Sequence, residues 1–306
     1  MTQSKLEALR LAEDALQVSS GGELMRDLPG RRRVVRYGDV VVKALAPVER
    51  AAWSRELAGL RALHHSDLAP SLIASGERWT ATEWVEGMPP GSLEFEEGPM
   101  HRVLGEALAR LHDRPPDELP EWSVADRLQE RFDDPPAACP AELLRGVRDL
   151  TAGWLPLLRH DAFVHGDWGT SNVLVRADHP MDVLAIIDFE DAHIGDPAED
   201  FRWQAMAGPT STQLPSMLAG YGRDLGRDSA QRIGIAAAEL CLEMLGWDLP
   251  EPERSRSHGA GRATLRALVD GWRPGRPARP RAVRVGAVTR PSASRLALGG
   301  ADSSTG

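Results

Sequence analysis

The chain has 306 residues, 42% of them hydrophobic, and a formal net charge of −9, so it holds enough apolar material for one large or two ordinary domains. Its two cysteines lie too far apart for a disulfide framework, and its acidic balance argues against a nucleic-acid partner. No stretch approaches the roughly 18 apolar residues of a membrane span, and the start lacks the pattern of a secretory signal, so we expect a cytoplasmic protein with no membrane contact.

The first elements predict a small β-rich domain. Leucines at helical spacing in residues 6–16 predict a helix, and the β-rich runs 31–37 and 40–44 flank Gly38-Asp39, which is typical of a hairpin. Lys43 stands at the end of a Val-Val-Val run, where a buried charge needs a partner. The alternative is an edge-strand lysine that discourages aggregation.

The next segment predicts a helix and then a boundary. Residues 48–63 have apolar positions at helical spacing, and Glu56 is the inward carboxylate of this helix unless it lies on a solvated face. Two further strands are predicted at 72–77 and 79–85, before a Pro/Gly cluster at 86–91. We therefore expect two lobes, 1–86 and 87–271.

The second lobe is predicted to be mainly helical. Residues 113–140 are expected to form a loop with one short helix, and 272–306 form an Arg/Pro-rich tail expected to be disordered. The tail carries a net charge of +6, which leaves about −15 on the remainder and is compatible with a cationic small substrate. Helices are predicted at 100–112, 141–158, 201–206, 214–221, 231–247 and 258–271.

Residues 163–201 contain the candidate catalytic and metal-binding residues. The apolar runs 173–175 and 183–187 predict a hairpin of two buried strands. Asp167 and Asn172 precede the first strand, and Asp188 follows the second together with further carboxylates, so the hairpin gathers acidic side chains at one end. Such a cluster repels itself unless a cation sits in it, and hard oxygen donors suit Mg²⁺.

The spacing in this stretch is specific. His165-Gly166-Asp167 with Asn172 gives H-x-D-x-x-x-x-N, and Asp188-Phe189 follows one hairpin later, in the order of the catalytic and metal-binding loops of kinases. Together with Ile187–Asp191 and the GDPxxD run that ends at Asp200, it resembles the aminoglycoside phosphotransferase and choline kinase-like family. A metal hydrolase using His160, His165 and Asp167 would leave Asn172 and Asp188 unexplained.

The resemblance implies an α+β, protein kinase-like two-lobed fold, with a small β-rich N-lobe that binds ATP and a larger, mainly helical C-lobe that holds the catalytic loop, the Mg²⁺ site and the substrate. Asp167 is expected to orient and deprotonate the acceptor hydroxyl, while Asn172 and Asp188 hold Mg²⁺. His165 is expected to be structural. Asp200 is expected to accept hydrogen bonds from the backbone of the catalytic loop.

The nucleotide contacts also follow from the resemblance. Lys43 would meet the phosphates and be held by Glu56, as in the kinase ion pair. Gly30 would stand in the loop over the phosphates, although the full Gly-x-Gly-x-x-Gly pattern is missing there. Glu83 and Val85 would belong to the hinge that holds adenine by backbone groups.

The expected activity is transfer of the γ-phosphoryl group of ATP to a hydroxyl of a small molecule, an antibiotic that carries amines. Two alternatives stay open: a kinase of a choline-, homoserine- or sugar-like metabolite, and a nucleotide-binding regulator without turnover. Glu239 and Glu243 fall on one helix face and could line an amine pocket or a solvated face.

Overall fold

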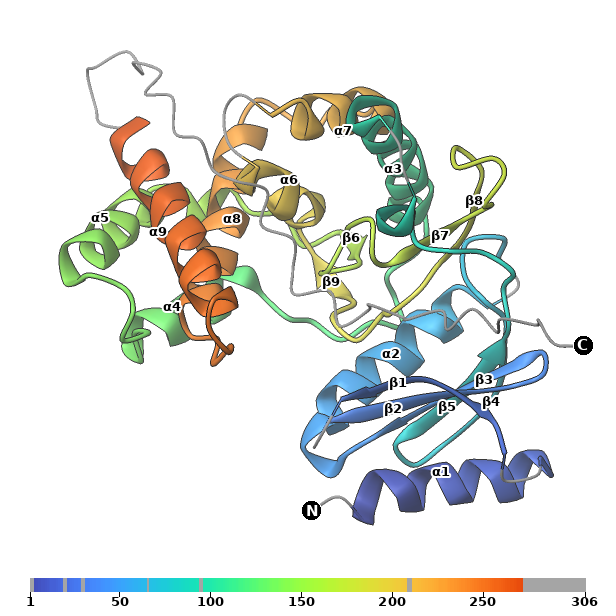
Figure 1. Cartoon of the computed structure of the whole chain (residues 1–306). Coiled ribbons are helices and arrows are strands. Elements are labelled where there is room, and N and C mark those ends of the chain that lie inside the picture. Colours follow the sequence, from blue (N-terminus) through green and yellow to red (C-terminus); the bar gives the residue numbers. More distant parts are fainter. Residues whose placement is uncertain are drawn as a thin grey trace, which may run out of the picture. The chain divides into compact units, whose positions relative to one another are not determined.

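The computed structural model describes residues 3–18, 21–28, 31–64, 66–93, 96–207 and 211–271. The chain forms two compact units (Figure 1). Among the described residues, the first contains those up to Ala51 and Ile73–Trp84, and the second contains Ala52–Leu72 and those from Val85 onward. Gly30 and the predicted tail 272–306 lie outside the described residues.

The first unit is an antiparallel five-stranded sheet with one helix along one of its faces (Figure 1). Its strand order is β1-β2-β3-β5-β4, and the predicted hairpin of β2 and β3 turns at Gly38, where φ is +61°. Glycine adopts this left-handed conformation at no steric cost. The unit contains α1 (Gln3–Leu16), β1 (Glu23–Leu28), β2 (Arg32–Tyr37), β3 (Val40–Leu45), β4 (Leu72–Gly76) and β5 (Trp79–Glu83).

The core of the first unit lies between α1 and the sheet. Ala8, Leu9 and Ala12 of α1 pack against Val42 and Ala44 of β3 and their sheet neighbours. Because side chains alternate along a strand, Lys43 lies on the other face of the sheet. Val41 lies on the same face and is, like Lys43, partly exposed, whereas Leu45 there is buried.

Strand β1 was not predicted. It reads ELMRDL, and none of its six side chains is buried, so it lacks the apolar alternation by which a half-buried strand is recognised. It pairs with β2 at the edge of the sheet, where polar side chains meet solvent.

The second unit is mainly helical, with two short antiparallel two-stranded sheets, β6–β9 and the hairpin β7–β8. One apolar cluster joins α3 and α7 to the β7–β8 hairpin, and a second joins α4, α5, α8 and α9. The elements are α2 (Arg50–Ala62, which begins in the first unit), α3 (Glu97–His112), α4 (Val124–Asp133), α5 (Ala141–Ala152), β6 (Ala162–Val164), β7 (Val173–Val175), β8 (Val183–Ile186), β9 (His193–Gly195), α6 (Arg202–Met206), α7 (Gln213–Tyr221), α8 (Ser229–Leu245) and α9 (Glu253–Gly271), with 3₁₀ turns η1 (Pro47–Glu49), η2 (Pro90–Ser92), η3 (Leu155–Leu157) and η4 (Pro197–Phe201).

Two predicted helices are shorter than expected for the same reason. The segment 48–63 begins with η1 before α2, and the segment 141–158 ends as α5 at Ala152 and continues as η3. Pro47 and Pro156 lie in these 3₁₀ turns, and proline has no N–H for the α-helical ladder. None of the helices in the described ranges combines the length and apolarity of a bilayer-spanning helix.

Candidate active site

The loop between β6 and β7 contains His165, Gly166 and Asp167. Gly166 has φ +80°, and a Cβ there would lie 2.3 Å from the carbonyl oxygen of Asp191. Only glycine fits this position, because both the backbone conformation and the close approach of Asp191 exclude a side chain. The loop is therefore locked against the segment that follows β8.

Asp167 is 5% exposed, and both of its carboxylate oxygens accept hydrogen bonds. Nδ2 of Asn172 donates to Oδ2 at 2.8 Å and to the backbone oxygen of Asp167 at 2.8 Å. Nε1 of Trp203 donates to Oδ1 at 3.0 Å. The two predicted residues of the catalytic loop are thus in direct contact, and a tryptophan that the sequence did not single out joins them.

His165 is completely buried and serves the backbone. Its Nε2 lies 3.1 Å from the carbonyl oxygen of Ile187, and its Nδ1 accepts from the N–H of Asp167 at 3.2 Å. Burial lowers the pKa of His165. A neutral imidazole that donates through Nε2 and accepts through Nδ1 satisfies this geometry. These backbone contacts agree with the structural role predicted for His165.

The β7–β8 hairpin brings Asn172 and Asp188 to the same end. Val173 pairs with Ile186, and the N–H of Ile187 donates to the carbonyl oxygen of Asn172 at 2.9 Å. Asp188 comes one residue later, with φ +68°, a value that is uncommon outside glycine and that turns the chain away from the strand. Hairpin formation therefore brings residues Asn172 and Asp188 to one end of the hairpin, as the sequence predicted.

The chemistry of this pair fits Mg²⁺. The amide nitrogen of Asn172 is used by Asp167, so its oxygen is the atom suited to a cation, and Asp188 adds a carboxylate. Among the residues that the structure describes, no group of three His, Cys, Asp or Glu side chains is placed to hold a metal ion. Two hard oxygen donors, with phosphate and water in the other positions, are the usual protein share of a Mg²⁺ site in phosphoryl transfer.

Residues 200–202 hold the catalytic loop from the other side. The carboxylate of Asp200 accepts from the backbone N–H groups of His165 and Gly166, both at 2.8 Å, which confirms the predicted contact. Its Oδ2 also lies 3.0 Å from Nε2 of His112. Burial would raise the pKa of Asp200, but the hydrogen bond from His112 and these other interactions lower it. Arg202 donates to the carbonyl oxygen of Gly166.

Buried arginines neutralise part of the acidic cluster. Glu239, which is 1% exposed, accepts from Nη1 of Arg202 at 2.9 Å and lies 3.5 Å from Nε of Arg127. The half-buried Arg55 lies 3.7 Å from Oδ1 of Asp191 and donates to the carbonyl oxygen of Glu190 at 2.6 Å. Glu239 is therefore part of a buried ion-pair network. It lies neither on a solvated helix face nor in an amine pocket, the two alternatives considered from the sequence.

Glu243 and Asp191 keep more exposure than Glu239. The indole N–H of Trp247 donates to Glu243 at 3.3 Å, and the ring of Trp247 lies 6.4 Å from that of Trp203. Burial, followed by the negative charge of Glu239, raises the pKa of Glu243. Burial also raises the pKa of Asp191, against the opposing effect of Arg202. Both carboxyls would be stabilised in their charged form by a further cation.

The residues predicted to contact the nucleotide lie on β3, at the end of β5 and on α2. Lys43 lies on the face of the sheet that does not carry α1, and Glu83 ends β5 with its side chain exposed, two residues before Val85. Glu56 is a buried residue of α2. The guanidinium carbon of Arg36 lies over the ring of the adjacent Trp84, 4.0 Å from the ring centroid. The backbone N–H of Trp84 donates to the carbonyl oxygen of Asp39 at 2.7 Å.

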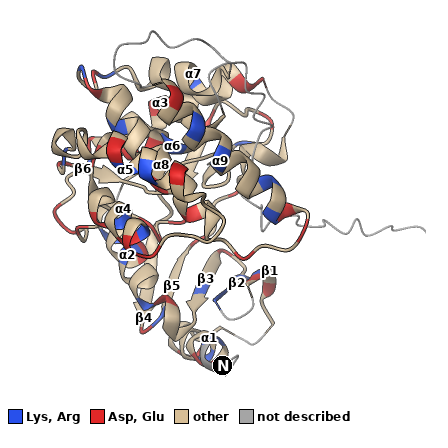
Figure 2. Ribbon diagram, turned by 90° about the vertical axis from the view of Figure 1, so that its left-hand side faces the viewer, with Lys and Arg blue, Asp and Glu red and all other residues tan. Residues whose placement is uncertain are grey.

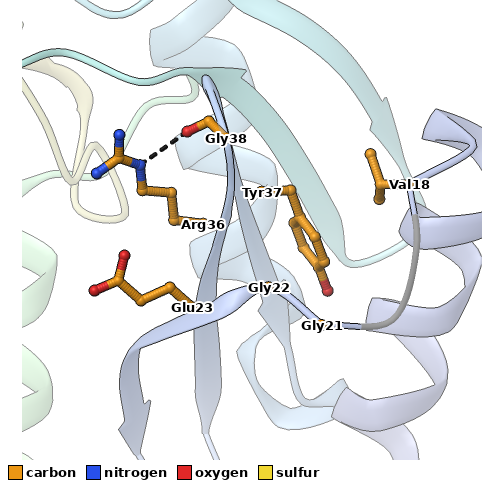
Figure 3. A pocket seen from close by; sticks show the side chains of 7 residues that line it. All are labelled: Val18, Gly21, Gly22, Glu23, Arg36, Tyr37 and Gly38. Atoms are coloured by element: carbon orange, nitrogen blue, oxygen red, sulfur yellow. Dashed lines mark hydrogen bonds between the residues drawn. The ribbon is translucent and has the colours of Figure 1, made fainter.

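A separate cavity of about 630 Å³ lies in the first unit (Figure 3). Arg36 and Tyr37 of β2 line it, with Glu23 at the start of β1. None of the residues predicted to contact the nucleotide lines this cavity.

Both signs of charge are interspersed along the helices of the second unit (Figure 2).

The residues that sequence reasoning missed are His112, Arg127, Arg202 and Trp203. Arg202 and Trp203 come two and three residues after Asp200, so their nearness to the motif was the available signal. Arg127 and His112 come from α4 and α3, far along the chain, and only the tertiary structure brings them to this site.

Comparison with known proteins agrees with this architecture. The chain resembles the solved GDP complex of aminoglycoside 2'-phosphotransferase-IIIa, with 17% identity over 87% of this chain and 98% of that one, at a TM-score of 0.60. Choline kinase LicA from Streptococcus pneumoniae has 14% identity, with coverage of 86% and 99% and a TM-score of 0.66. Macrolide 2'-phosphotransferase MphH from Brachybacterium faecium has 20% identity, with coverage of 85% and 98% and a TM-score of 0.55.

The curated protein sequences gave no match. The model of the phosphotransferase enzyme family, abbreviated APH, matches residues 30–235, which is more than half of the chain. Solved structures similar to this chain carry ATP, ADP or GDP. The chain therefore belongs to the APH phosphotransferase family and has its protein kinase-like α+β fold.

Proposed function

We propose that the chain transfers the γ-phosphoryl group of ATP to a hydroxyl of a small, amine-bearing antibiotic. The observation that carries the transfer reaction is the contact of Asp167 with Asn172, at the hairpin end to which Asp188 also belongs. These three residue types in this order serve phosphoryl transfer in kinases. We place the reaction in the cytoplasm, where ATP is available.

Asp167 is the proposed base. The hydroxyl oxygen of the acceptor forms a bond to the γ-phosphorus, the bond from that phosphorus to the bridging oxygen breaks, and ADP leaves. Asp167 orients the hydroxyl and takes up its proton late in the transfer. The carboxylate oxygens of Asp167 offer about four acceptor positions, of which Asn172 and Trp203 use one each.

Asn172 and Asp188 are the proposed holders of Mg²⁺, which when bound neutralises charge on the phosphates. Lys43 is the proposed phosphate contact from the first unit, with Gly30 in the loop over the phosphates. Glu83 and Val85 supply the proposed backbone contacts to adenine. The Lys43–Glu56 ion pair stays a prediction, since the two residues belong to different units.

The amine on the acceptor is proposed from the charge of the site. Burial raises the pKa of Asp191 and Glu243, and the opposing charges of Arg202 and, for Asp191, Arg55 do not cancel that rise. A cationic group beside these two carboxyls would stabilise their charged forms. An uncharged acceptor offers no such gain.

The test is resistance combined with product analysis. The full chain and its Asp167→Asn variant are expressed in a sensitive host, and inhibition is measured for aminoglycosides, macrolides, peptide antibiotics and nucleoside antibiotics. We expect protection by the parent only, and a drug product heavier by one phosphoryl group. Turnover of choline, homoserine or a sugar without protection would assign the chain to metabolism, and ATP binding without consumption would make it a regulator.

A further inference from the structure

Trp203 makes a contact that the phosphotransferase reaction does not by itself explain. Its indole N–H, the single polar group of the side chain, donates to Oδ1 of Asp167 at 3.0 Å. The opposite oxygen, Oδ2, is held by Asn172 at 2.8 Å. Both oxygens of the Asp167 carboxylate thus accept hydrogen bonds, one from Asn172 just before β7 and one from Trp203 in α6.

Two donors determine the orientation of a carboxylate in a way that one cannot. Rotation about the Cβ–Cγ bond of aspartate is soft and has broad, two-fold preferences. A single hydrogen bond to Oδ2 would let Oδ1 swing about that contact. The second hydrogen bond, from Trp203, fixes the plane of the carboxylate and hence the direction of its remaining lone pairs.

The donor is itself held in place by its neighbours. Arg202, the preceding residue, donates to the carbonyl oxygen of Gly166 and to Glu239. The Trp203 ring lies 6.4 Å from that of Trp247 at an interplanar angle of 34°, and it packs against the apolar cluster of α4, α5, α8 and α9. The indole N–H therefore meets Asp167 in a preset position.

We propose that Trp203 is a positioning residue that fixes the orientation of the Asp167 carboxylate for phosphoryl transfer. The part in catalysis rests on the proposed function of Asp167. Reacting groups must be aligned to within a fraction of an ångström, and a misplacement of about 1 Å can cost about 100-fold in rate. The residue acts through Asp167 and need not contact the substrate.

The matched pair of variants is Trp203→Phe and Trp154→Phe. Each removes one indole N–H from a ring that packs against the apolar cluster of α4, α5, α8 and α9, but Trp154 follows α5 and its ring faces Gly234 of α8. With Mg·ATP and kanamycin or choline as the acceptor, Trp203→Phe should lower kcat about 10- to 100-fold and leave KM for ATP within about two-fold. Trp154→Phe should keep kcat within about three-fold of the parent.

A crystal structure of Trp203→Phe tests the orientation without any acceptor. We expect the Asp167 carboxylate to be rotated from its parental position or to occupy more than one. If the phenylalanine variant does not fold, 3-benzothienylalanine at position 203 keeps the ring shape and replaces the N–H by sulfur. An unchanged carboxylate in either Trp203 variant, or equal losses of kcat in Trp203→Phe and Trp154→Phe, would overturn the proposal.

The two proposals fail in different ways. If the parent chain phosphorylates neither kanamycin nor choline nor any antibiotic of the resistance panel, the proposed function fails. The crystal structure of the Trp203 variant still decides whether Trp203 orients Asp167. Turnover by the parent with a Trp203→Phe variant of parental kcat would leave the proposed function in place and remove the inference.

Discussion

Replacing Glu199 by glutamine should lower the free energy of unfolding of the second unit strongly, although the two side chains have nearly the same shape. Glu199 is 1% exposed in η4, directly before Asp200. Its Oε2 accepts from Nη2 of Arg127 at 2.7 Å and lies 3.1 Å from Nε2 of His193, and its Oε1 accepts from the N–H of Asp196 at 3.0 Å. Glu199→Gln keeps the volume but puts an amide N–H where an acceptor is needed.

The magnitude follows from the pKa of Glu199. Burial alone would raise it from the ordinary value of 4.5, but the charges and hydrogen bonds of His193 and Arg127 lower it to about 2. Because one pKa unit corresponds to about 1.4 kcal/mol, the ionised form contributes about 3 kcal/mol to the free energy of unfolding. Removing one partner of a buried ion pair typically costs about 3–5 kcal/mol, which agrees.

The pH dependence has a definite sign. A folded pKa below the unfolded one gives stability that is fully present above pH 4.5 and is lost as the pH falls towards about 2. Urea unfolding followed by far-UV circular dichroism should therefore show a deficit of about 3 kcal/mol for Glu199→Gln near neutral pH. The deficit should shrink as the pH falls below 4.5.

Glu130→Gln is the matched control, since Glu130 is exposed on α4 and its replacement should change stability by less than about 0.5 kcal/mol. A deficit for Glu199→Gln below about 1 kcal/mol near neutral pH would refute the reasoning. A large deficit that does not change with pH would show that the loss comes from packing and not from the charge.

Three further predictions concern other parts of the chain. Gly105→Ala should lower the free energy of unfolding by about 3 kcal/mol, because its Cβ would lie 2.0 Å from the carbonyl oxygen of Met217, whereas Gly98→Ala on the same helix meets nothing nearer than 3.6 Å and should be neutral or stabilising in urea melts. Asp200→Asn should cost about 2–4 kcal/mol in the same assay and lower kcat, because an amide cannot accept from both loop N–H groups. Lys43→Met should raise KM for ATP about 10-fold or more in a coupled ADP assay, with the fold retained by circular dichroism.

The arrangement of this loop could be predicted because its signals are local in sequence. The spacing of Asn172 and Asp188 around one hairpin brings them to the same end of it, and Asn172 contacts Asp167, whereas the catalytic and metal-binding roles of these residues stay predictions. The pair Gly38-Asp39 likewise identified the turn between β2 and β3. The strand β1 was missed because an edge strand without a buried face carries no alternation of apolar residues.

The electrostatics of the site could not be predicted in the same way. The sequence suggested that a bound cation must relieve the acidic cluster, but Arg55, Arg127 and Arg202 supply part of the compensation. These arginines come from three helices separated along the chain, so only packing shows where they lie. The side chain of Trp203 could not be assigned for the same reason, although it lies three residues after Asp200.

The central claim, that Asp167 is the base of a phosphotransferase, is tested most directly by turnover of the full chain and its Asp167→Asn variant. Both are incubated with Mg·ATP and the acceptor found in the resistance panel, and ADP and the phosphorylated product are quantified by mass. We predict one product per ADP for the parent, a kcat lower by about 10²- to 10⁴-fold for the variant, and equal affinity of both for ATP. A variant that transfers phosphate at nearly the parental rate would contradict the account.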